Sequence, residues 1–443
     1  MKSRLSYVQV IALGYAIMII LGTLLLMLPF ASASGESASF TDAFFTATSS
    51  SCVTGLVQVD TGTYWSFFGQ LVIIVLIQIG GLGFVTVATL FMMAMKKRIG
   101  IRSRELMIES INSSNIGGIL RLTKKILLGT LIIEGCGALI LTVRFAFDFP
   151  LGKAIWLGVF HSISAFCNAG FDLMGVIEPY SSLIHYSDDL TVTVTVMLLV
   201  IIGGIGFLVW DDILKNGVRF KKYSFHTKLV LCTSAVLIFG GALLMFIFEC
   251  NASNKQLSLG EQILASIFAS VSARTAGMNV TDTAAFSGAG KLVNIFLFLI
   301  GGSSGSTAGG IKTTTFAVLV IHAFSNMRGQ SYPSILGRRI SDGAVKKAIT
   351  VTFTNLSLAL VGAMVLMSLQ PFDMSDVLFE TFSAIGTVGM STGITRELCT
   401  ASKYVIIILM YLGRVGSISF AAAMMQKKAP PNISAPTEDI IIG

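Results

Sequence analysis

Four short turns of small and polar residues, each ending in glycine, recur along the chain, and their final glycines are 115, 107 and 112 residues apart. Short Thr/Gly segments are common, but four in register indicate one unit repeated within the chain. Such turns can bind a monovalent cation, because their carbonyls replace its hydration shell and glycine reaches the φ > 0 conformations required. The turns are Cys52-Val53-Thr54-Gly55, Cys167-Asn168-Ala169-Gly170, Arg274-Thr275-Ala276-Gly277 and Gly386-Thr387-Val388-Gly389.

A second glycine signal follows each turn after 24 to 33 residues, inside an apolar run. The constant order of the two signals predicts a unit made of a spanning helix, a half-membrane segment that ends in the turn, and a second spanning helix. We place these repeats at residues 1–98, 99–217, 218–328 and 329–428, followed by a tail at 429–443. The second signals are Gly80-Gly81, Gly203-Gly204, Gly301-Gly302 and Gly413-Arg414.

The fourth repeat shows how these elements position a turn. A spanning helix over 344–369 ends before Pro371, and a short helix capped by Ser375 or Asp376 follows. A helix of some ten residues is about 15 Å long, so it crosses only half a bilayer. Its C-terminal end brings negative partial charge to the turn, which favours cations. Nonhelical backbone inside a membrane must line a water-filled cavity. The alternative is four hairpins that only pack a helix bundle.

Composition indicates a membrane protein, because 53% of the residues are hydrophobic and 12% are charged, against about 25% charged in soluble domains. The apolar runs predict an all-α polytopic protein with eight transmembrane helices and four re-entrant pore helices around a central pore. No cleavable signal peptide is expected, and the first run is interpreted as a signal anchor. The runs lie near residues 7–30, 67–94, 126–146, 190–210, 228–249, 291–324, 345–369 and 403–425.

The net charge of +8 indicates membrane topology more than nucleic-acid binding, because 22 of the 31 Lys and Arg lie at the termini or in three connectors. By the positive-inside rule, the connectors and both termini lie in the cytoplasm, as in a multi-pass protein of the cytoplasmic membrane. Docking of a cytoplasmic partner on the connectors is the second interpretation. The connectors are residues 96–125, 215–228 and 328–347.

The interrupted run in the third repeat is the clearest difference among the repeats. Five glycines, three serines, a threonine and an alanine occur in succession, and each glycine costs a helix about 1 kcal/mol relative to alanine. The sequence therefore predicts a helix broken by a polar intramembrane loop, which we interpret as a gate; a close-packing GxxxG seam is the alternative. The loop residues are Gly301, Gly302, Ser303, Ser304, Gly305, Ser306, Thr307, Ala308, Gly309 and Gly310.

Three cations lie close to these signals. Arg414 is in mid-span, where an arginine without polar partners costs at least about 2.5–3.5 kcal/mol. We therefore expect it to face inward near residues 303–310, where it repels cations or latches the loop. Lys312 either faces the cytoplasmic vestibule or anchors the helix at the interface. Arg274 is expected either to brace the third turn through Glu380 or to be exposed at the outer mouth.

The turns resemble a known family. Thr387-Val388-Gly389 resembles the first half of a potassium-channel filter, although Met390 follows where channels carry Tyr. Together with five further stretches, the turns resemble the Trk/Ktr/HKT superfamily of potassium transporters, most closely the membrane subunit of bacterial Ktr systems. Gly55 looks like the potassium-preferring form, because a serine there goes with sodium preference in the plant branch. The further stretches are Asp60–Gly62, Gln78–Gly83, His161–Phe166, Ala273–Gly277 and Gly413–Gly416.

This resemblance implies one pore per polypeptide, with the turns as the selectivity filter for K⁺ and with the loop, Lys312 and Arg414 as the gate. It implies potassium uptake, leaves Na⁺ open as a coupling or activating ion, and implies a homodimer in the lipid bilayer. The homodimer would bind a cytoplasmic nucleotide-binding regulatory ring of KtrA-type subunits and no nucleic acid.

Enzymatic chemistry is not expected, because the sequence has no Ser/His/Asp arrangement, no P-loop and no metal-like Cys/His spacing. No covalent cofactor is expected either. Two alternatives stay open: a transporter for sodium or another monovalent cation, and a membrane scaffold that does not conduct. The apolar end of the tail is expected at the dimer interface, with disorder as the alternative.

Overall fold

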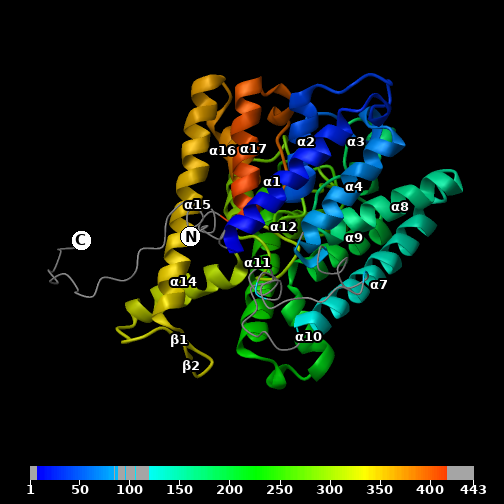
Figure 1. The fold of residues 1–443 in the computed structure, drawn as a ribbon. Coiled ribbons are helices and arrows are strands. Elements are labelled where there is room, and N and C mark those ends of the chain that lie inside the picture. The colour runs from blue at the N-terminus through cyan, green and yellow to red at the C-terminus, as the bar shows by residue number, and fades with distance from the viewer. Residues whose placement is uncertain (1–6, 84, 88–94, 96–104, 106–118, 417–443) are drawn as a thin grey trace, which may run out of the picture.

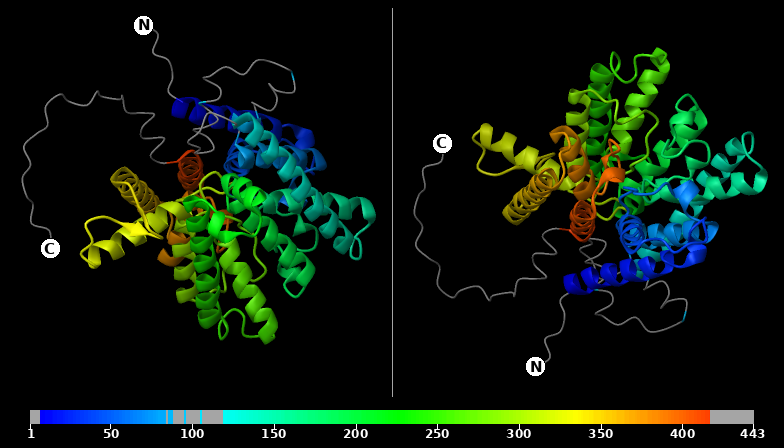
Figure 2. Two further views of the ribbon diagram at one scale, coloured as in Figure 1. Left: turned by 90° about the horizontal axis from the view of Figure 1, so that it is seen from below. Right: turned by 90° about the horizontal axis from the view of Figure 1, so that it is seen from above.

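A computed structural model describes residues 7–83, 85–87, 95, 105 and 119–416. These residues form a helical assembly with one small antiparallel strand pair, β1 (Ser334–Ile335) with β2 (Arg338–Arg339). Seen along the vertical axis of Figure 1, four groups of helices surround a common centre (Figure 2). The predicted tail lies outside the described residues.

A long helix, a short helix and a second helix follow one another in each of the four groups (Figure 1). The long helices are α1 (Tyr7–Leu26), α7 (Ile119–Phe145), α11 (Phe225–Glu249) and α15 (Asp342–Leu369). The short helices are α2 (Phe40–Cys52), α8 (Leu151–Phe166), α12 (Leu259–Ser272) and α16 (Met374–Gly386). The second helices are α4 (Phe67–Leu82), α9 (Leu190–Gly204) with α10 (Phe207–Asn216), α13 (Gly288–Leu299) with α14 (Thr313–Met327), and α17 (Thr400–Val415). A four-residue helix, α3 (Thr61–Tyr64), lies between α2 and α4.

Local signals set the starts of the short helices. Ser39 and Asp373 accept hydrogen bonds from the first-turn amides of α2 and α16, and Ser258 forms a capping box with Glu261 at the start of α12. The helix α8 begins after Pro150, which suits a helix start because its missing N–H is not needed there. These caps start each short helix at the outer end of a group, so its C-terminal end carries the turn inward.

Within the described residues, four helices are long and apolar enough to cross a membrane, and the pair α9 and α10 would be a fifth span with a bend of 97°. The described helices α4, α13 and α17 are shorter because they end at or next to the glycine signals, and α14 begins only after the glycine-rich loop. The left-handed glycines that follow α4, α9 and α17 are Gly83 (φ +82°), Gly206 (φ +96°) and Gly416 (φ +89°). Sequence reasoning expected the break only in the third repeat and treated residues 190–210 as one continuous span. That expectation was wrong, because a glycine at this level ends the helix in the second repeat as well.

Polar contacts join neighbouring groups near the outer ends of the second helices. The fourth residue of α13, Lys291, pairs with Asp376 of α16 at 2.8 Å, and the fourth residue of α17, Lys403, pairs with Asp42 of α2 at 2.9 Å. The corresponding residue of α4 is uncharged: Gln70 accepts a hydrogen bond of 2.7 Å from Trp156 of α8. These contacts fix α4, α13 and α17 against the short helix of the next group.

Replacing Lys403 with Met should destabilise the protein by about 1–3 kcal/mol, because the apolar stem remains but the half-buried Asp42 loses a charged partner. The measurement is thermal unfolding in detergent or nanodiscs. Lys255→Met is the matched control, because Lys255 is exposed on a loop. Equal unfolding temperatures for the two variants would show that the pair contributes nothing.

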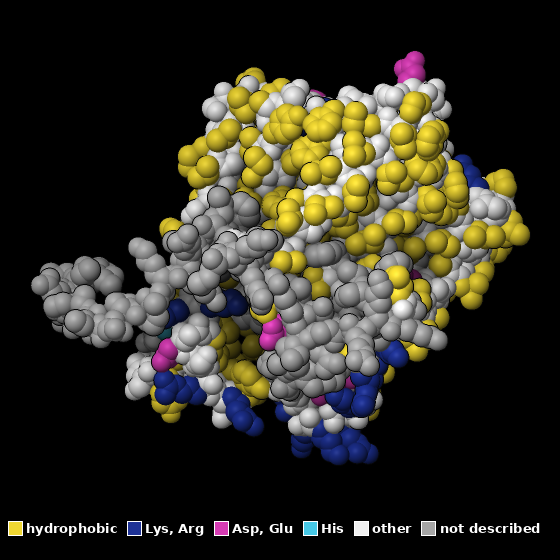
Figure 3. Space-filling model, viewed as in Figure 1, with side chains coloured by type: hydrophobic (Ala, Val, Ile, Leu, Met, Phe, Trp, Pro, Cys, Tyr) yellow, Lys and Arg dark blue, Asp and Glu magenta, His cyan; other side chains and the backbone are white. Residues whose placement is uncertain are grey.

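Charged side chains separate along the molecule. Hydrophobic side chains cover the upper part in Figure 3, and Lys and Arg gather at the lower end, near α10 and the β1–β2 hairpin. Among the charged residues of this lower end are Lys215, Lys221, Lys222, Arg338 and Arg339.

Candidate functional site

The four turns share one backbone conformation. In each, the final glycine and the residue two places before it have positive φ, which costs a residue with a Cβ roughly 1–2 kcal/mol. Four equivalent non-glycine residues with positive φ indicate a functional site, because such backbone strain persists only where the surrounding structure imposes it. The φ values are +58° and +94° for Val53 and Gly55, +57° and +71° for Asn168 and Gly170, +80° and +79° for Thr275 and Gly277, and +50° and +96° for Thr387 and Gly389.

The final glycines form a closed ring. A Cβ atom placed on any of them would collide with the carbonyl oxygen just before the glycine of the next repeat, and the fourth returns to the first. The turns therefore converge on one axis, and no side chain fits between them. The distances from the added Cβ to that carbonyl oxygen are 2.6 Å for Gly55 and Ala169, 2.9 Å for Gly170 and Ala276, 2.4 Å for Gly277 and Val388, and 2.1 Å for Gly389 and Thr54.

Serine hydroxyls brace the turns from behind. The hydroxyls of Ser49 and Ser383 each accept a 3.1 Å hydrogen bond from the glycine amide six residues later. Ser164 donates to the carbonyl of Phe171 at 2.6 Å, and Ser272 donates to the carbonyl of Met278. Sequence reasoning missed these serines, although three of them lie six residues before the final glycine. In the third repeat the interval is five, because one residue fewer separates the serine from the turn.

The second glycine signals provide close packing behind the turns. Cβ atoms on Gly80, Gly203 and Gly413 would lie 2.2, 1.9 and 2.2 Å from carbonyl oxygens in the last turns of the short helices, at Ser51, Phe166 and Ile385. In the third repeat, Gly301 instead faces the carbonyl of Gly309, at 2.3 Å from such a Cβ. In the first, second and fourth repeats, the two signals found in the sequence are thus two sides of one contact between a short helix and the second helix of the same repeat.

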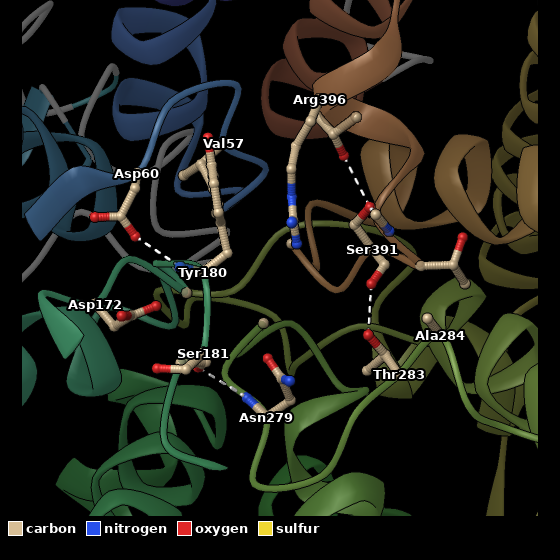
Figure 4. Close-up of a pocket in the computed structure, with 18 of the residues that line it drawn as sticks. Val57, Asp60, Asp172, Tyr180, Ser181, Asn279, Thr283, Ala284, Ser391 and Arg396 are labelled. Carbon is tan, nitrogen blue, oxygen red and sulfur yellow. Dashed lines mark hydrogen bonds between the residues drawn. The ribbon is translucent and has the colours of Figure 1, made fainter. Parts of the chain in front are cut away.

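A cavity of about 580 Å³ opens outside the ring, and all four final glycines line it (Figure 4). Its walls are mostly acidic and polar, and the guanidinium of Arg396 lies 3.9 Å from the centre of the Tyr180 ring. The half-buried Asp172 accepts a 2.9 Å hydrogen bond from the Met174 amide. Burial, together with the nearby Asp60 carboxylate, raises the pKa of Asp172 to about 7. The acidic residues of the cavity are Asp60, Asp172, Glu178, Asp282 and Glu397.

The glycine-rich loop lies against the turns on the side away from this cavity. It leaves α13 and returns to α14 through a bridge between Ile300 and Ile311. A Cβ on Gly309 would lie 2.0 Å from the hydroxyl oxygen of Thr387, and Thr307 donates a 3.2 Å hydrogen bond to the carbonyl of Phe166. The predicted loop is therefore present, and it contacts turns of two other repeats.

Two cations hold the loop through backbone carbonyls. Arg414 donates to the carbonyl of Thr307 in the loop, to the carbonyls of Gly80 and Gly81 at the end of α4, and to the Tyr15 hydroxyl at 3.3 Å. Lys312 donates to the carbonyl of Ala308 at 2.7 Å. Neither cation forms an ion pair within the described part of the chain. The expectation that Arg414 faces inward beside the loop agrees with this geometry.

Both expectations for Arg274 were wrong. Its side chain is only 8% exposed and donates a 3.3 Å hydrogen bond to Ser234 of α11, so it lies neither beside Glu380 nor at the outer mouth. Glu380 accepts hydrogen bonds from Ser391 and Thr395 of its own repeat. The Arg274 side chain points away from the third turn and lines a small cavity between the second and third repeats, together with Asn168.

Metal chemistry finds no support in the geometry. Within the described residues, no group of three or more His, Cys, Asp or Glu side chains is placed to hold a metal ion. The six cysteines, all of which lie in described segments, are free thiols. The arrangement that remains is a ring of backbone carbonyls between an acidic outer cavity and a latched inner loop.

Comparison with known proteins gives consistent results. The family model TrkH, described as a cation transport protein, matches residues 6–433. The chain is 41% identical to the potassium/sodium uptake protein NtpJ of Enterococcus hirae, over 100% of the chain and 98% of that protein. It is 39% identical to the Ktr system potassium uptake protein B of Bacillus subtilis, over 99% and 97%. The crystal structure of the potassium transporter TrkH from Vibrio parahaemolyticus has the same fold, with a TM-score of 0.74 at 17% identity over 96% of this chain and 86% of that one.

Proposed function

The chain belongs to the TrkH family of cation transport proteins, and we propose that it is the ion-conducting subunit of a potassium uptake system of the cytoplasmic membrane. It is a membrane transport protein and not an enzyme. The observation that carries the potassium proposal is the closed ring of four glycine turns, whose backbone places carbonyl oxygens around one axis. Such oxygens can replace the water shell of K⁺ without a charged side chain at the ion.

The outer cavity and the short helices both favour a cation. Five carboxyl residues line the cavity against one arginine, so cations concentrate in front of the ring. The C-terminal ends of α2, α8, α12 and α16 bring negative partial charge to the turns that follow them. An ion would lose its water in the cavity and pass the turns in single file. In this proposal all four residues of each turn, from Cys52–Gly55 to Gly386–Gly389, form the filter.

Uptake at low potassium concentration should depend on pH through Asp172. Since its pKa is about 7, the carboxyl is neutral below that pH and negative above it, so the KM for K⁺ should fall as the pH rises from about 6 to 8. The expected change is a few-fold, because a unit charge close to an ion in water contributes on the order of 1 kcal/mol. Asp172→Asn should remove this dependence. The same pH dependence in that variant would exclude Asp172 as its cause.

The gate is the second part of the proposal. The loop Gly301–Gly310 lies against the inner side of the turns, and Arg414 and Lys312 hold it there through its carbonyls. A latched loop directly beneath the filter would close the ion path. Release of the latch would open it. The proposed roles of these residues rest on their position in the described structure.

Topology and assembly complete the proposal. We infer eight spans and four pore helices in repeats at 1–98, 99–217, 218–328 and 329–428, with both termini in the cytoplasm. The gathering of Lys and Arg at one end of the molecule supports this orientation (Figure 3). Two relatives are named as protein B of a Ktr system, which fits a chain that works with another component. We propose that this chain forms a homodimer and binds a cytoplasmic nucleotide-binding regulatory subunit, as its resemblance to the membrane subunits of Ktr systems implies. The tail at 429–443 is proposed for the dimer contact.

Sodium is the second candidate substrate, because a relative of 41% identity is named a potassium/sodium uptake protein. The test is growth of cells that lack their own potassium uptake systems, carrying this chain, at low external potassium with and without added sodium. Rescue that requires potassium alone supports the proposal, and rescue only with sodium present indicates sodium coupling. Failure to rescue with a correctly inserted protein would favour a scaffold that does not conduct.

A further inference from the structure

The break between α9 and α10 receives the glycine-rich loop of the next repeat. The loop amides of Ser303 and Thr307 donate to the carbonyls of Gly204 and Gly203, at 2.9 and 3.3 Å. In return, the amide of Phe207 donates to the carbonyl of Gly305 at 2.8 Å. Backbone of the loop is thus bonded to the end of one helix and to the beginning of the next.

These bonds complete the C-terminal end of α9. A helix leaves its last four carbonyls without internal partners, and in a membrane such groups need partners from elsewhere. The carbonyl of Ile201 accepts a hydrogen bond from the amide of Ile205, and the carbonyl of Ile202 accepts one of 2.9 Å from the indole N–H of Trp210. Among the described residues, the last two carbonyls, at Gly203 and Gly204, accept hydrogen bonds only from the loop amides. Withdrawal of the loop would therefore leave two buried carbonyls and one helix-start amide without partners.

Gly206 shapes this contact. Its φ is +96°, and a Cβ there would lie 2.7 Å from the carbonyl oxygen of Ser304. Only glycine combines this conformation with the close approach of the loop. The glycines at the corresponding level of the first and fourth repeats, Gly83 and Gly416, also have positive φ. Repeat three has Ser304 instead, and its chain continues into the loop that fills the break of repeat two.

The helix α10, on the other side of this contact, is fixed to α7. Trp210 packs over Gly129 of α7, whose added Cβ would lie 3.2 Å from the indole ring. Asp211 pairs with Lys125 of α7 at 2.7 Å and also with Lys215. The helix α10 is therefore held against α7, and its first amide is held against the loop. A displacement of α10 would act directly on the loop.

We propose that the α9–α10 break is the seat of the gate loop, and that Gly206 and the Phe207 amide are positioning groups that set its closed position. This inference rests on the proposed role of the loop as a gate. The seat differs from the Arg414 latch, because it lies in the second repeat and uses backbone groups alone. Weakening of the seat should loosen the loop and raise uptake without any change in the filter.

Phe207→Pro tests the seat directly, because the proline ring removes the amide hydrogen that points at the Gly305 carbonyl and also takes up the space in which that carbonyl lies. Proline is well tolerated at the first residue of a helix, and Gly206 has a ψ of 142°, which suits a residue before proline. The variant loses the amide that binds Gly305 and also loses a ring that packs on Trp210. Phe207→Ala is the matched control, because it loses the same ring but keeps the amide.

Hydrogen–deuterium exchange of the full-length protein in nanodiscs gives a measurement that does not depend on transport. In peptides covering residues 301–312, exchange should be about 2- to 10-fold faster in Phe207→Pro than in Phe207→Ala. Equal exchange in the two variants would contradict the proposal that the α9–α10 break holds the loop. Basal rubidium uptake should likewise be higher in Phe207→Pro than in Phe207→Ala. Faster exchange with unchanged uptake would support the seat and would contradict the gate role of the loop.

Gly206→Ala provides an independent second test. The added methyl group should speed exchange both at 205–210 and at 301–312, because one contact serves both segments. Gly217→Ala is the control, since Gly217 also has positive φ (+57°) but has no atom within 4 Å of an added Cβ. If Gly206→Ala loosens only its own segment and leaves the loop as in the control, the seat is wrong.

Discussion

Replacing Arg414 with glutamine should raise basal rubidium uptake by at least about tenfold. The guanidinium joins three elements that are distant in sequence: the loop at Thr307, the end of α4 at Gly80 and Gly81, and Tyr15 of α1. A hydrogen bond to a charged group contributes about 1.5–3 kcal/mol, so loss of even one favours release of the loop by about tenfold or more. The substitution also removes a positive charge that opposes cations beneath the filter. The measurement is rubidium uptake by cells or proteoliposomes without a regulatory partner.

Two further variants separate the latch from the charge. Arg414→Lys keeps the charge but cannot reproduce the planar fork that reaches several carbonyls at once. A latch predicts that it leaks almost as much as glutamine does, whereas a purely electrostatic barrier predicts uptake close to wild type. Arg339→Gln is the control, because Arg339 lies exposed on the β2 strand. If Arg414→Gln takes up rubidium no faster than this control, Arg414 is not part of the gate.

Replacing Gly389 with serine should abolish the preference for potassium over sodium or block uptake altogether. Its φ is +96°, and an added Cβ would lie 2.1 Å from the carbonyl oxygen of Thr54 in the adjoining turn. The ring must therefore distort, and the backbone strain alone is about 1–2 kcal/mol. A loss of that size in potassium binding corresponds to about a tenfold fall in selectivity. The measurement is competition of potassium and sodium with rubidium uptake.

Gly393→Ser is the matched control for this substitution. Gly393 lies four residues later and also has positive φ (+105°), but no atom lies within 4 Å of an added Cβ. Both variants carry comparable backbone strain, and only the one at Gly389 intrudes on the ring. Equal selectivity of the two variants would show that the ring does not discriminate between cations.

The site was predictable to the extent that it depends on local backbone chemistry. The turns and the second signals were visible because glycine is required where φ is positive or where another backbone approaches closely. Structure explains both: Gly55 needs a left-handed φ, and Gly80 leaves room for the carbonyl of Ser51. The loop was visible because ten small residues in succession cannot continue a helix in an apolar run.

What sequence reasoning missed depends on contacts between repeats. Nothing in the local sequence shows that Arg274 points to Ser234 and away from Glu380, because its partner lies 40 residues away on another helix. The bend at Gly206 was also missed, because the pair Gly203-Gly204 was interpreted only as a close-packing signal within one span and Gly206 was not considered. Its significance depends on a loop about 100 residues away that supplies the missing partners for the helix end.

The central claim is that the four glycine turns form one filter that selects potassium. It is tested most directly by rubidium uptake into proteoliposomes containing the purified protein, with potassium or sodium added as competitor. The account predicts saturable uptake that potassium inhibits at far lower concentration than sodium, and loss of this difference in Gly389→Ser but not in Gly393→Ser. Equal inhibition of the wild-type protein by the two ions would contradict it.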